Sequence, residues 1–318
     1  MEQPMHFQTF EGSDCDILVR THQLQKRFGS KIVLDIDHNR ILCDSVYGLV
    51  GPNGAGKTTF LRILAGIYQP DAGICQLDNQ SIWENPASKS RVLFLPDQPA
   101  FLTHSSMDEM AALYSRMYPA FSPRLFDELT ATFKLNRKAR LKTFSKGMKR
   151  QAALCLVIAA QPDLLLLDEA FDGLDPVMRQ VLKRVLAGLV ADRGMSVVIS
   201  SHNLRELEDF CDHLGLLHNG RILIEQDLDE LKQGLCRIQV AWTKPLDEAQ
   251  LRSIGLNLLE YKRRGSVIQL VAGGSREDLI QMLQVTSPLL LEALPLTLEE
   301  IFIQTMEVNG YDIANIIE

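Results

Sequence analysis

A glycine-rich segment between an apolar run and a helical pattern carries the first chemical signal in this sequence. It follows the apolar residues 46–50 and precedes an apolar-periodic stretch at 60–65. Glycines let successive backbone N–H groups turn toward an anion, and a helix start adds unpaired donors and a positive dipole end. Lys57 can then reach the β- and γ-phosphates of a nucleoside triphosphate, and the Thr58 hydroxyl can bind Mg²⁺. The predicted binding residues are Gly51, Pro52, Asn53, Gly54, Ala55, Gly56, Lys57, Thr58 and Thr59.

Two carboxylates stand at the end of a strongly apolar run in the second half of the chain. Four leucines at 164–167 precede Asp168 and Glu169. Such a run suits a strand buried on both faces of a parallel sheet, and the carboxyl ends of these strands line the ligand crevice. We therefore expect Asp168 to face the magnesium ion, directly or through water. Glu169 is expected to polarise the water that attacks the γ-phosphate.

A histidine at the end of a further predicted strand completes the candidate catalytic set. Phosphoryl transfer depends on positioning and charge compensation more than on covalent chemistry. His202 stands at the end of the strand expected at 196–200 and can donate a hydrogen bond to the γ-phosphate. Lys57, Glu169 and His202 are therefore the predicted catalytic residues. The other six histidines show no metal-ligand spacing.

The composition is that of an ordinary globular protein with a complete hydrophobic core. Apolar residues make up 46% of the 318 residues, and charged residues make up 23%. The net charge of −7 argues against a nucleic-acid partner. Six cysteines lie far apart without a Cys-x-x-Cys pair, which favours buried, reduced thiols over a disulfide framework or a zinc site.

The sequence shows neither a secretory signal nor a stretch that could cross a membrane. Residues 1–14 are polar and acidic, without the charged and apolar regions of a signal peptide. The apolar run 154–160 ends at Gln161 and Pro162, too short to span a bilayer. If the protein works at a membrane, we expect another chain to supply the membrane-spanning part.

Strand and helix patterns alternate along most of the chain. Between about residues 106 and 160 the pattern is helical, and another helix is expected at 177–191. The alternation predicts an α/β fold with a mostly parallel sheet, an antiparallel β portion and a helical insert. Strands are expected at 17–19, 31–36, 46–50, 73–77, 92–95, 164–167 and 196–200.

Changes in this pattern predict the domain boundaries. Residues 1–15 are expected to be a disordered N-terminus. Residues 16–235 are expected to form the main domain, with the helical insert at about 99–160, and residues 236–318 a small α+β extension. This extension shows no catalytic constellation, so it is either a packing or dimer-bracing element or a regulatory ligand site. Ser275 and Thr297 each stand three residues before an acidic residue, as at helix starts.

Two further segments bear on the protein's family. Residues 144–148 (Phe-Ser-Lys-Gly-Met) precede a helix expected to begin near Met148, and residues 173–175 read Gly-Leu-Asp. These segments are similar to the signature motif (Leu-Ser-Gly-Gly-Gln) and to the D-loop of ATP-binding cassette (ABC) transporters. The order of the motifs within residues 16–235 resembles that of the nucleotide-binding subunit of these transporters. The resemblance implies a P-loop NTPase fold, with ATP and Mg²⁺ as ligands.

The family pattern implies a head-to-tail pair of cassettes, either a homodimer or a heterodimer with a related cassette. Each ATP would lie on the glycine loop of one subunit, capped by the positive end of the signature helix of the other. Ser145 can also be a simple helix N-cap. Phe28 matches the aromatic residue that stacks on adenine, although a core phenylalanine remains an alternative. The remaining residues implied by the resemblance are Ser145, Lys146, Gly147 and Met148 of the signature and Asp175 of the D-loop.

Several positions depart from the family pattern. The Q-loop glutamine normally follows an apolar-Pro pair directly, but here Asp97 lies between residues 95–96 (Leu-Pro) and Gln98. Either Asp97 or Gln98 can therefore be the additional magnesium contact. Lys146 and Met148 replace the consensus Gly and Gln of the signature. A bacterial exporter-type sub-group with Leu-Pro-Glu and Ser-Lys-Gly-Met at these places is similar.

A run of basic residues stands out in this acidic protein. It is interpreted either as a solvated face of the helical insert or as a positive rim that reduces repulsion when the partner's ATP approaches. The run consists of Arg137, Lys138, Arg140, Lys142, Lys146, Lys149 and Arg150.

The resemblance implies an ATPase that drives a separate transmembrane permease subunit, with export as the expected direction. The chain would then be cytoplasmic and peripheral on the inner face of the cell membrane. The alternative is a cytosolic, non-transport cassette ATPase that acts on ribosomes or DNA. Translation-linked members usually carry two cassettes, and DNA-repair members carry a long coiled coil; neither feature is present in this sequence.

Overall fold

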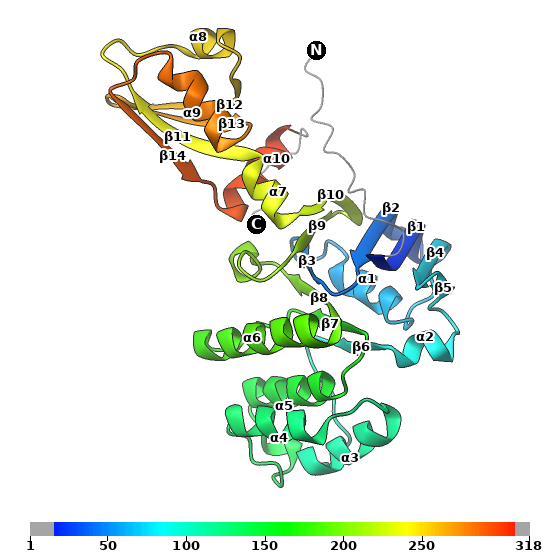
Figure 1. The fold of residues 1–318 in the computed structure, drawn as a ribbon. Helices are drawn as coiled ribbons and strands as arrows, with labels where there is room; N and C mark the ends of the chain where they lie inside the picture. Colours follow the sequence, from blue (N-terminus) through cyan, green and yellow to red (C-terminus); the bar gives the residue numbers. More distant parts are fainter. Residues whose placement is uncertain (1–15, 309–318) are drawn as a thin grey trace. The chain divides into compact units, whose positions relative to one another are not determined.

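The structure of the protein, a computed structural model, describes residues 16–308 (Figure 1). The predicted N-terminal segment 1–15 lies outside the described residues. The chain divides into two compact units at Glu225–Gln226. Each unit has its own hydrophobic core.

A six-stranded sheet forms the centre of the first unit. Its strand order is β10-β9-β3-β8-β7-β6, and β3, β6, β7, β8 and β9 are joined by parallel pairings. All five residues of β7 are buried, as its leucine run predicts. The strands are β3 (Val46–Val50), β6 (Val92–Leu95), β7 (Leu164–Asp168), β8 (Ser196–Ser201), β9 (His213–His218) and β10 (Arg221–Asp227).

The second sheet of this unit is antiparallel, with the order β2-β1-β4-β5. Its first two strands are much longer than the expected 17–19 and 31–36, because they pair along a hairpin from Ile17↔Leu42 to Phe28↔Lys31. Polar residues near the hairpin end obscure this strand pattern in the sequence. The strands are β1 (Ile17–Phe28), β2 (Lys31–Leu42), β4 (Ala72–Leu77) and β5 (Gln80–Ser81).

The helices of the first unit begin at well-defined caps. The Ser145 side chain accepts a hydrogen bond from Met148 N, so α5 starts at Lys146 rather than near Met148. Asp175 caps α6, which ends at Gly194. Helices α3, α4 and α5 pack together as the insert. The helices are α1 (Lys57–Leu64), α2 (Pro86–Ser90), α3 (Met107–Met117), α4 (Pro123–Thr132), α5 (Lys146–Ala159) and α6 (Pro176–Arg193), with 3₁₀ turns at Leu141–Thr143 and Leu204–Glu206.

The cysteines within residues 16–308 are free thiols, as their spacing predicts. Cys75, Cys155, Cys211 and Cys236 are buried, and burial raises the pKa of the Cys75 thiol to about 12. Cys15 lies outside the described residues. Among residues 16–308, no helix combines the length and the apolar character that crossing a membrane requires.

The second unit has the β-α-β-β-α-β order of a split βαβ fold (Figure 1). Its antiparallel sheet has the order β12-β13-β11-β14. Ser275 caps α9 and Thr297 accepts from Glu300 N, so both predicted helix starts are confirmed. Its elements are α7 (Leu228–Gln233), β11 (Leu235–Ala241), α8 (Glu248–Ser253), β12 (Asn257–Arg264), β13 (Val267–Gly273), α9 (Arg276–Gln284), β14 (Leu290–Pro295) and α10 (Leu298–Val308).

Candidate functional site

The glycine loop connects β3 to α1, as the sequence predicts. A Cβ atom at Gly51 would lie 2.1 Å from the Leu217 carbonyl oxygen, and Gly56 has a φ of +113°, so both positions require glycine. Lys57 is 6% exposed, and its Nζ donates to the carbonyl oxygens of Gly51 at 2.6 Å and Pro52 at 3.3 Å. The backbone of the loop therefore fixes the lysine at the start of α1.

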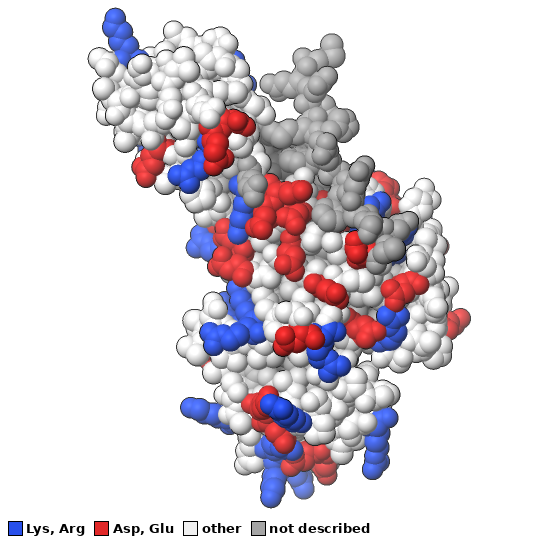
Figure 2. Space-filling view, in the orientation of Figure 1, with Lys and Arg blue, Asp and Glu red and all other residues white. Residues whose placement is uncertain are grey.

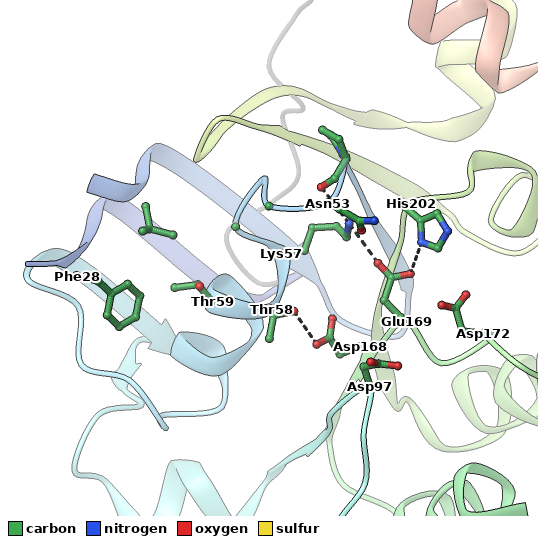
Figure 3. A pocket seen from close by; sticks show the side chains of 14 residues that line it. Phe28, Asn53, Lys57, Thr58, Thr59, Asp97, Asp168, Glu169, Asp172 and His202 are labelled. Carbon is green, nitrogen blue, oxygen red and sulfur yellow. Dashed lines mark hydrogen bonds and ion pairs between the residues drawn. The ribbon is translucent and has the colours of Figure 1, made fainter. Parts of the chain in front are cut away.

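A pocket of about 520 Å³ lies over this loop (Figure 3). Phe28 lies at one end and the acidic side chains and His202 at the other, with Thr58 and Thr59 between them. One apolar end and one polar end suit the base and the phosphates of a nucleotide. The lining residues are Phe28, Val33, Pro52, Asn53, Gly54, Gly56, Lys57, Thr58, Thr59, Asp97, Asp168, Glu169, Asp172 and His202.

Phe28 lies at the end of the β1–β2 hairpin and is not a core residue. Its side chain is 47% exposed. The ring meets Tyr68 edge to face at 5.6 Å between centroids, and Lys26 Nζ lies 5.6 Å from the Phe28 centroid. One face of an aromatic ring at a pocket edge is a suitable platform for a planar base.

Side-chain oxygens that could bind a metal cation lie close together beside the loop. Thr58 Oγ1 donates to Asp168 Oδ2 at 2.8 Å, and Ser200 Oγ donates to Asp168 Oδ1 at 2.7 Å. Asp168 and Ser200 are 2% and 1% exposed. A hydroxyl and a carboxylate in contact match the oxygen ligands that Mg²⁺ prefers. These residues therefore fit a magnesium site.

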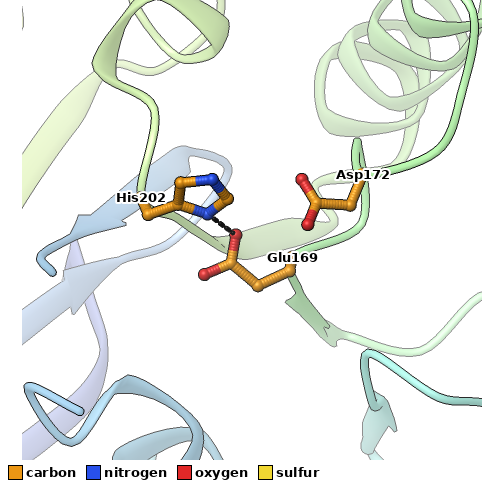
Figure 4. A group of neighbouring side chains, drawn as sticks. All are labelled: Glu169, Asp172 and His202. Atoms are coloured by element: carbon orange, nitrogen blue, oxygen red, sulfur yellow. Dashed lines mark hydrogen bonds and ion pairs between the residues drawn. The ribbon is translucent and has the colours of Figure 1, made fainter. Parts of the chain in front are cut away.

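The Glu169 carboxylate lies between a lysine and a histidine. Its Oε1 is 3.2 Å from Lys57 Nζ, and its Oε2 is 2.9 Å from His202 Nδ1. Glu169, Asp172 and His202 point toward one another (Figure 4), with side-chain polar atoms within 4.8 Å. The cluster stands at the polar end of the pocket, where general base chemistry on water requires a carboxylate oriented by neighbouring polar groups.

Several predicted residues do not line the pocket. Ala55 is buried, and Gly51 contributes its carbonyl to Lys57. Of the two Q-loop alternatives, Asp97 lines the pocket, whereas Gln98 lines a second hollow, which Asp97 and Arg150 also line. The structure therefore brings Asp97, and not Gln98, to the predicted nucleotide site.

The signature residues and the D-loop lie next to each other outside the pocket. Ser145, Lys146, Met148 and Asp175 are exposed, and Gly147 is half-buried. A Cβ atom at Gly147 would lie 3.4 Å from the carbonyl oxygen of Gly173. In a single chain these segments do not reach the glycine loop's pocket.

The basic run is not a single surface. Lys138, Arg140, Lys142 and Lys146 are exposed, but Arg150 is buried, so a solvated face is the wrong interpretation for Arg150. On the face shown in Figure 2, basic and acidic side chains are interspersed over the insert. Arg137, for example, pairs with Asp108 and Asp127.

Sequence reasoning missed three polar residues around the site: Asp172, Ser200 and Arg150. Ser200 stands two residues before His202 at a strand end, a position that could have indicated a role. Asp172 stands three residues after Glu169, and its nearness to this predicted catalytic residue could also have indicated a role. Arg150 lacked such a signal, because its burial depends on the packing of α5.

The family of the chain follows from comparison with known proteins. A family model described as ABC transporter matches residues 37–172. The ABC transporter ATP-binding protein YtrB of Bacillus subtilis is 32% identical over 276 residues, which cover 84% of this chain and 94% of YtrB. The Nod factor export ATP-binding protein I of Burkholderia lata is 34% identical over 209 residues, covering 64% and 68% of the two chains.

Solved structures agree with this fold. The ATP-binding subunit of an ABC transporter superimposes with a TM-score of 0.62 at 26% identity, covering 68% of this chain and 92% of that chain. The predicted P-loop NTPase fold is thereby confirmed. Because YtrB is matched over nearly its whole length at this identity, the chain belongs to the ABC transporter family as an ATP-binding, ATP-hydrolysing protein.

Proposed function

We propose that this chain binds ATP and Mg²⁺ in the pocket over its glycine loop and uses Glu169 to activate the attacking water. The observation that carries the proposal is the position of the Glu169 carboxylate, which contacts both Lys57 and His202 beside the loop. Lys57 would compensate phosphate charge, and His202 would hydrogen-bond the γ-phosphate and orient the carboxylate. That these groups line a single pocket supports the proposal.

The remaining lining residues divide between base and phosphates. Phe28 would stack on adenine at the apolar end of the pocket, and the loop amides and Thr59 would surround the phosphates. Thr58 and Asp168 would hold Mg²⁺, with Asp97 as the Q-loop residue beside them. When bound, Mg²⁺ supplies charge neutralisation for the phosphates.

We also propose that two cassettes, identical or related, complete each other's sites. The exposed end of α5, with Ser145 as its N-cap, lies outside the pocket of its own chain. A helix N-terminus with unpaired N–H groups is suited to an anion. Asp175 and the signature are neighbours through Gly147 and Gly173, so both would face the partner's ATP together.

The proposed consequence of this pairing is transport. Cassette closure on ATP would drive a conformational change in a separate transmembrane permease, with this chain on the cytoplasmic face of the membrane. Export is the proposed direction, supported by the likeness to a Nod factor export protein and by the Leu-Pro-Asp and Ser-Lys-Gly-Met segments.

The test is the variant Glu169→Gln, measured as steady-state ATP hydrolysis and as nucleotide affinity. Replacing the carboxylate removes the general base, so turnover should fall about a hundredfold or more. The affinity for ATP should stay within about threefold, because the loop contacts persist.

The matched control is Glu84→Gln. Glu84 is exposed and outside the pocket, and its φ of +53° resembles the +49° of Glu169. Its variant should hydrolyse ATP at the wild-type rate. Turnover of Glu169→Gln close to wild type would show that another group activates the water.

A further inference from the structure

A buried arginine lies outside the machinery described above. Arg150 is 3% exposed and stands on α5, five residues after Ser145. Its Nη1 donates to the carbonyl oxygens of Glu169 at 2.7 Å and Asp172 at 2.5 Å. Its Nη2 donates to both the backbone carbonyl and the carboxylate of Asp97. One guanidinium therefore joins α5, the segment after β6 and the turn after β7.

The backbone of Glu169 needs such support. Its φ of +49° lies in the left-handed region, which residues with a side chain rarely adopt unless their surroundings impose it. The Glu169 N–H donates to Ser200 Oγ at 3.0 Å. The Glu169 carbonyl accepts from Arg150 and from the Asp172 N–H at 3.1 Å. A side chain from β8 thus binds the backbone N–H of Glu169, and a side chain from α5 binds its backbone carbonyl.

The chemistry of the guanidinium suits this task. A buried charge must be paired and hydrogen-bonded, and the Asp97 carboxylate supplies the countercharge while three carbonyls accept the remaining bonds. The two terminal nitrogens of a planar guanidinium can donate hydrogen bonds to two different segments at once, whereas a lysine ammonium is a compact point charge. The pair also explains an acid at position 97, where the family pattern has glutamine.

We propose that Arg150 is a positioning residue for ATP hydrolysis, which fixes the backbone at Glu169 so that the carboxylate faces Lys57 and His202. Arg150 is absent from the pocket lining within the described residues, so it acts through Glu169 and not on the nucleotide. It also connects this turn to the helix whose N-terminus carries the signature. The inference rests on the proposed role of Glu169.

The test is the variant Arg150→Met in the full-length protein. The methionine keeps the aliphatic length but removes every hydrogen bond, so the Glu169 carboxylate should lose its orientation. We expect kcat to fall about tenfold to a hundredfold. The dissociation constant for ATP without Mg²⁺ should stay within about threefold, because Arg150 contacts neither Phe28 nor the glycine loop, and only its partner Asp97 lies beside the proposed magnesium site. Arg150→Lys should retain an intermediate kcat.

A second readout separates positioning from general destabilisation. In a Glu169→Gln background, Arg150→Met should lower kcat by less than about twofold, because the residue that it positions is already disabled. Additive losses would overturn the proposal. So would a wild-type kcat in Arg150→Met, or in Arg150→Lys if the methionine variant fails to fold.

The control is Arg124→Met, the same substitution at an exposed ion pair on α4, which should keep the wild-type kcat. Failure of the two proposals can be told apart. If Glu169→Gln loses turnover while Arg150→Met does not, only the positioning role is wrong. If Glu169→Gln retains turnover, the proposed function itself is wrong.

Discussion

Phe28 is a large aromatic residue that packing leaves half exposed. The ring is 47% exposed at the tip of the β1–β2 hairpin, and one edge meets Tyr68. It shares the pocket with Val33 and with the phosphate loop. In the proposed nucleotide complex, the ring of Phe28 would bury its free face against the base.

The variant Phe28→Ala should therefore weaken nucleotide binding without changing the chemistry. Aromatic–base stacking is worth on the order of 1–3 kcal/mol, so the dissociation constant for ATP should rise about tenfold. The kcat at saturating ATP should change little, because Glu169 and Lys57 are unaffected. A titration with a fluorescent ATP analogue measures the effect.

Ile32→Ala provides the comparison for this substitution. Ile32 lies on the same hairpin with 45% exposure but does not line the pocket. Its variant should bind ATP as the wild type does. Equal losses in both variants would mean that the hairpin contributes through stability and that Phe28 makes no base contact.

The positions of Lys57, Thr58 and the two acids in the pocket could be predicted from the local sequence. Lys57, Thr58 and Asp168 each stand next to a turn or strand end that the sequence displays. Arg150 could not be predicted, because its contact with the backbone of Glu169 joins segments 19 residues apart. The choice between Asp97 and Gln98 likewise depends on which side chain turns toward α1.

At the scale of elements, the half-buried carboxyl of Glu225 joins β10 to the antiparallel hairpin. Glu225 accepts hydrogen bonds from Asn39 Nδ2 and from the Arg40 N–H, and Tyr47 Oη lies 3.3 Å away. Burial raises the pKa of Glu225 to about 7, although these donors favour the charged form. The strands β10, β2 and β3 thus share one ionisable group.

This pKa makes stability depend on pH. Between the unfolded value of 4.5 and about 7 the folded protein binds more protons than the unfolded chain. The free energy of unfolding should therefore fall as the pH rises through this window. Above the window, Glu225 is ionised in the folded protein, and the loss of stability is complete. Glu225→Gln mimics the protonated form, so it should gain about 2–3 kcal/mol relative to wild type between pH 5 and pH 8.

Urea denaturation of both proteins at the two pH values measures this difference. Other titrating groups cancel in the comparison because both proteins contain them. Glu84→Gln, which changes an exposed carboxyl, should show the same stability relative to wild type at pH 5 and pH 8. A Glu225→Gln effect that does not vary with pH would show that Glu225 is ionised in both folded and unfolded chains.

Helix starts could be predicted because capping is encoded within four residues, as at Ser275 and Thr297. The extent of the β1–β2 hairpin could not be predicted. Its strands alternate imperfectly, with half-buried polar residues before the bulge between Lys26 and Arg27 and the exposed Arg27 after it. Long-range pairing, rather than local pattern, sets the length of these strands.

At the scale of the whole molecule, two hydrophobic cores predict two steps of unfolding. The core of the first unit includes Tyr47, Phe60 and Leu166. The core of the second unit includes Ile238, Leu251 and Leu270. The proposed nucleotide pocket lies in the first unit, so ATP should stabilise that unit alone.

Differential scanning calorimetry of the full-length Glu169→Gln variant, which keeps ATP intact during the scan, should therefore show two transitions. With MgATP at a hundred times its dissociation constant, the stabilisation of about 2.7 kcal/mol should raise the Tm of one transition by about 5–10 °C. The other Tm should shift by less than about 1 °C. Addition of Phe28→Ala should reduce only the nucleotide-dependent shift, which assigns that transition to the first unit. A single transition that moves as a whole would instead mean that the two units unfold as one cooperative body.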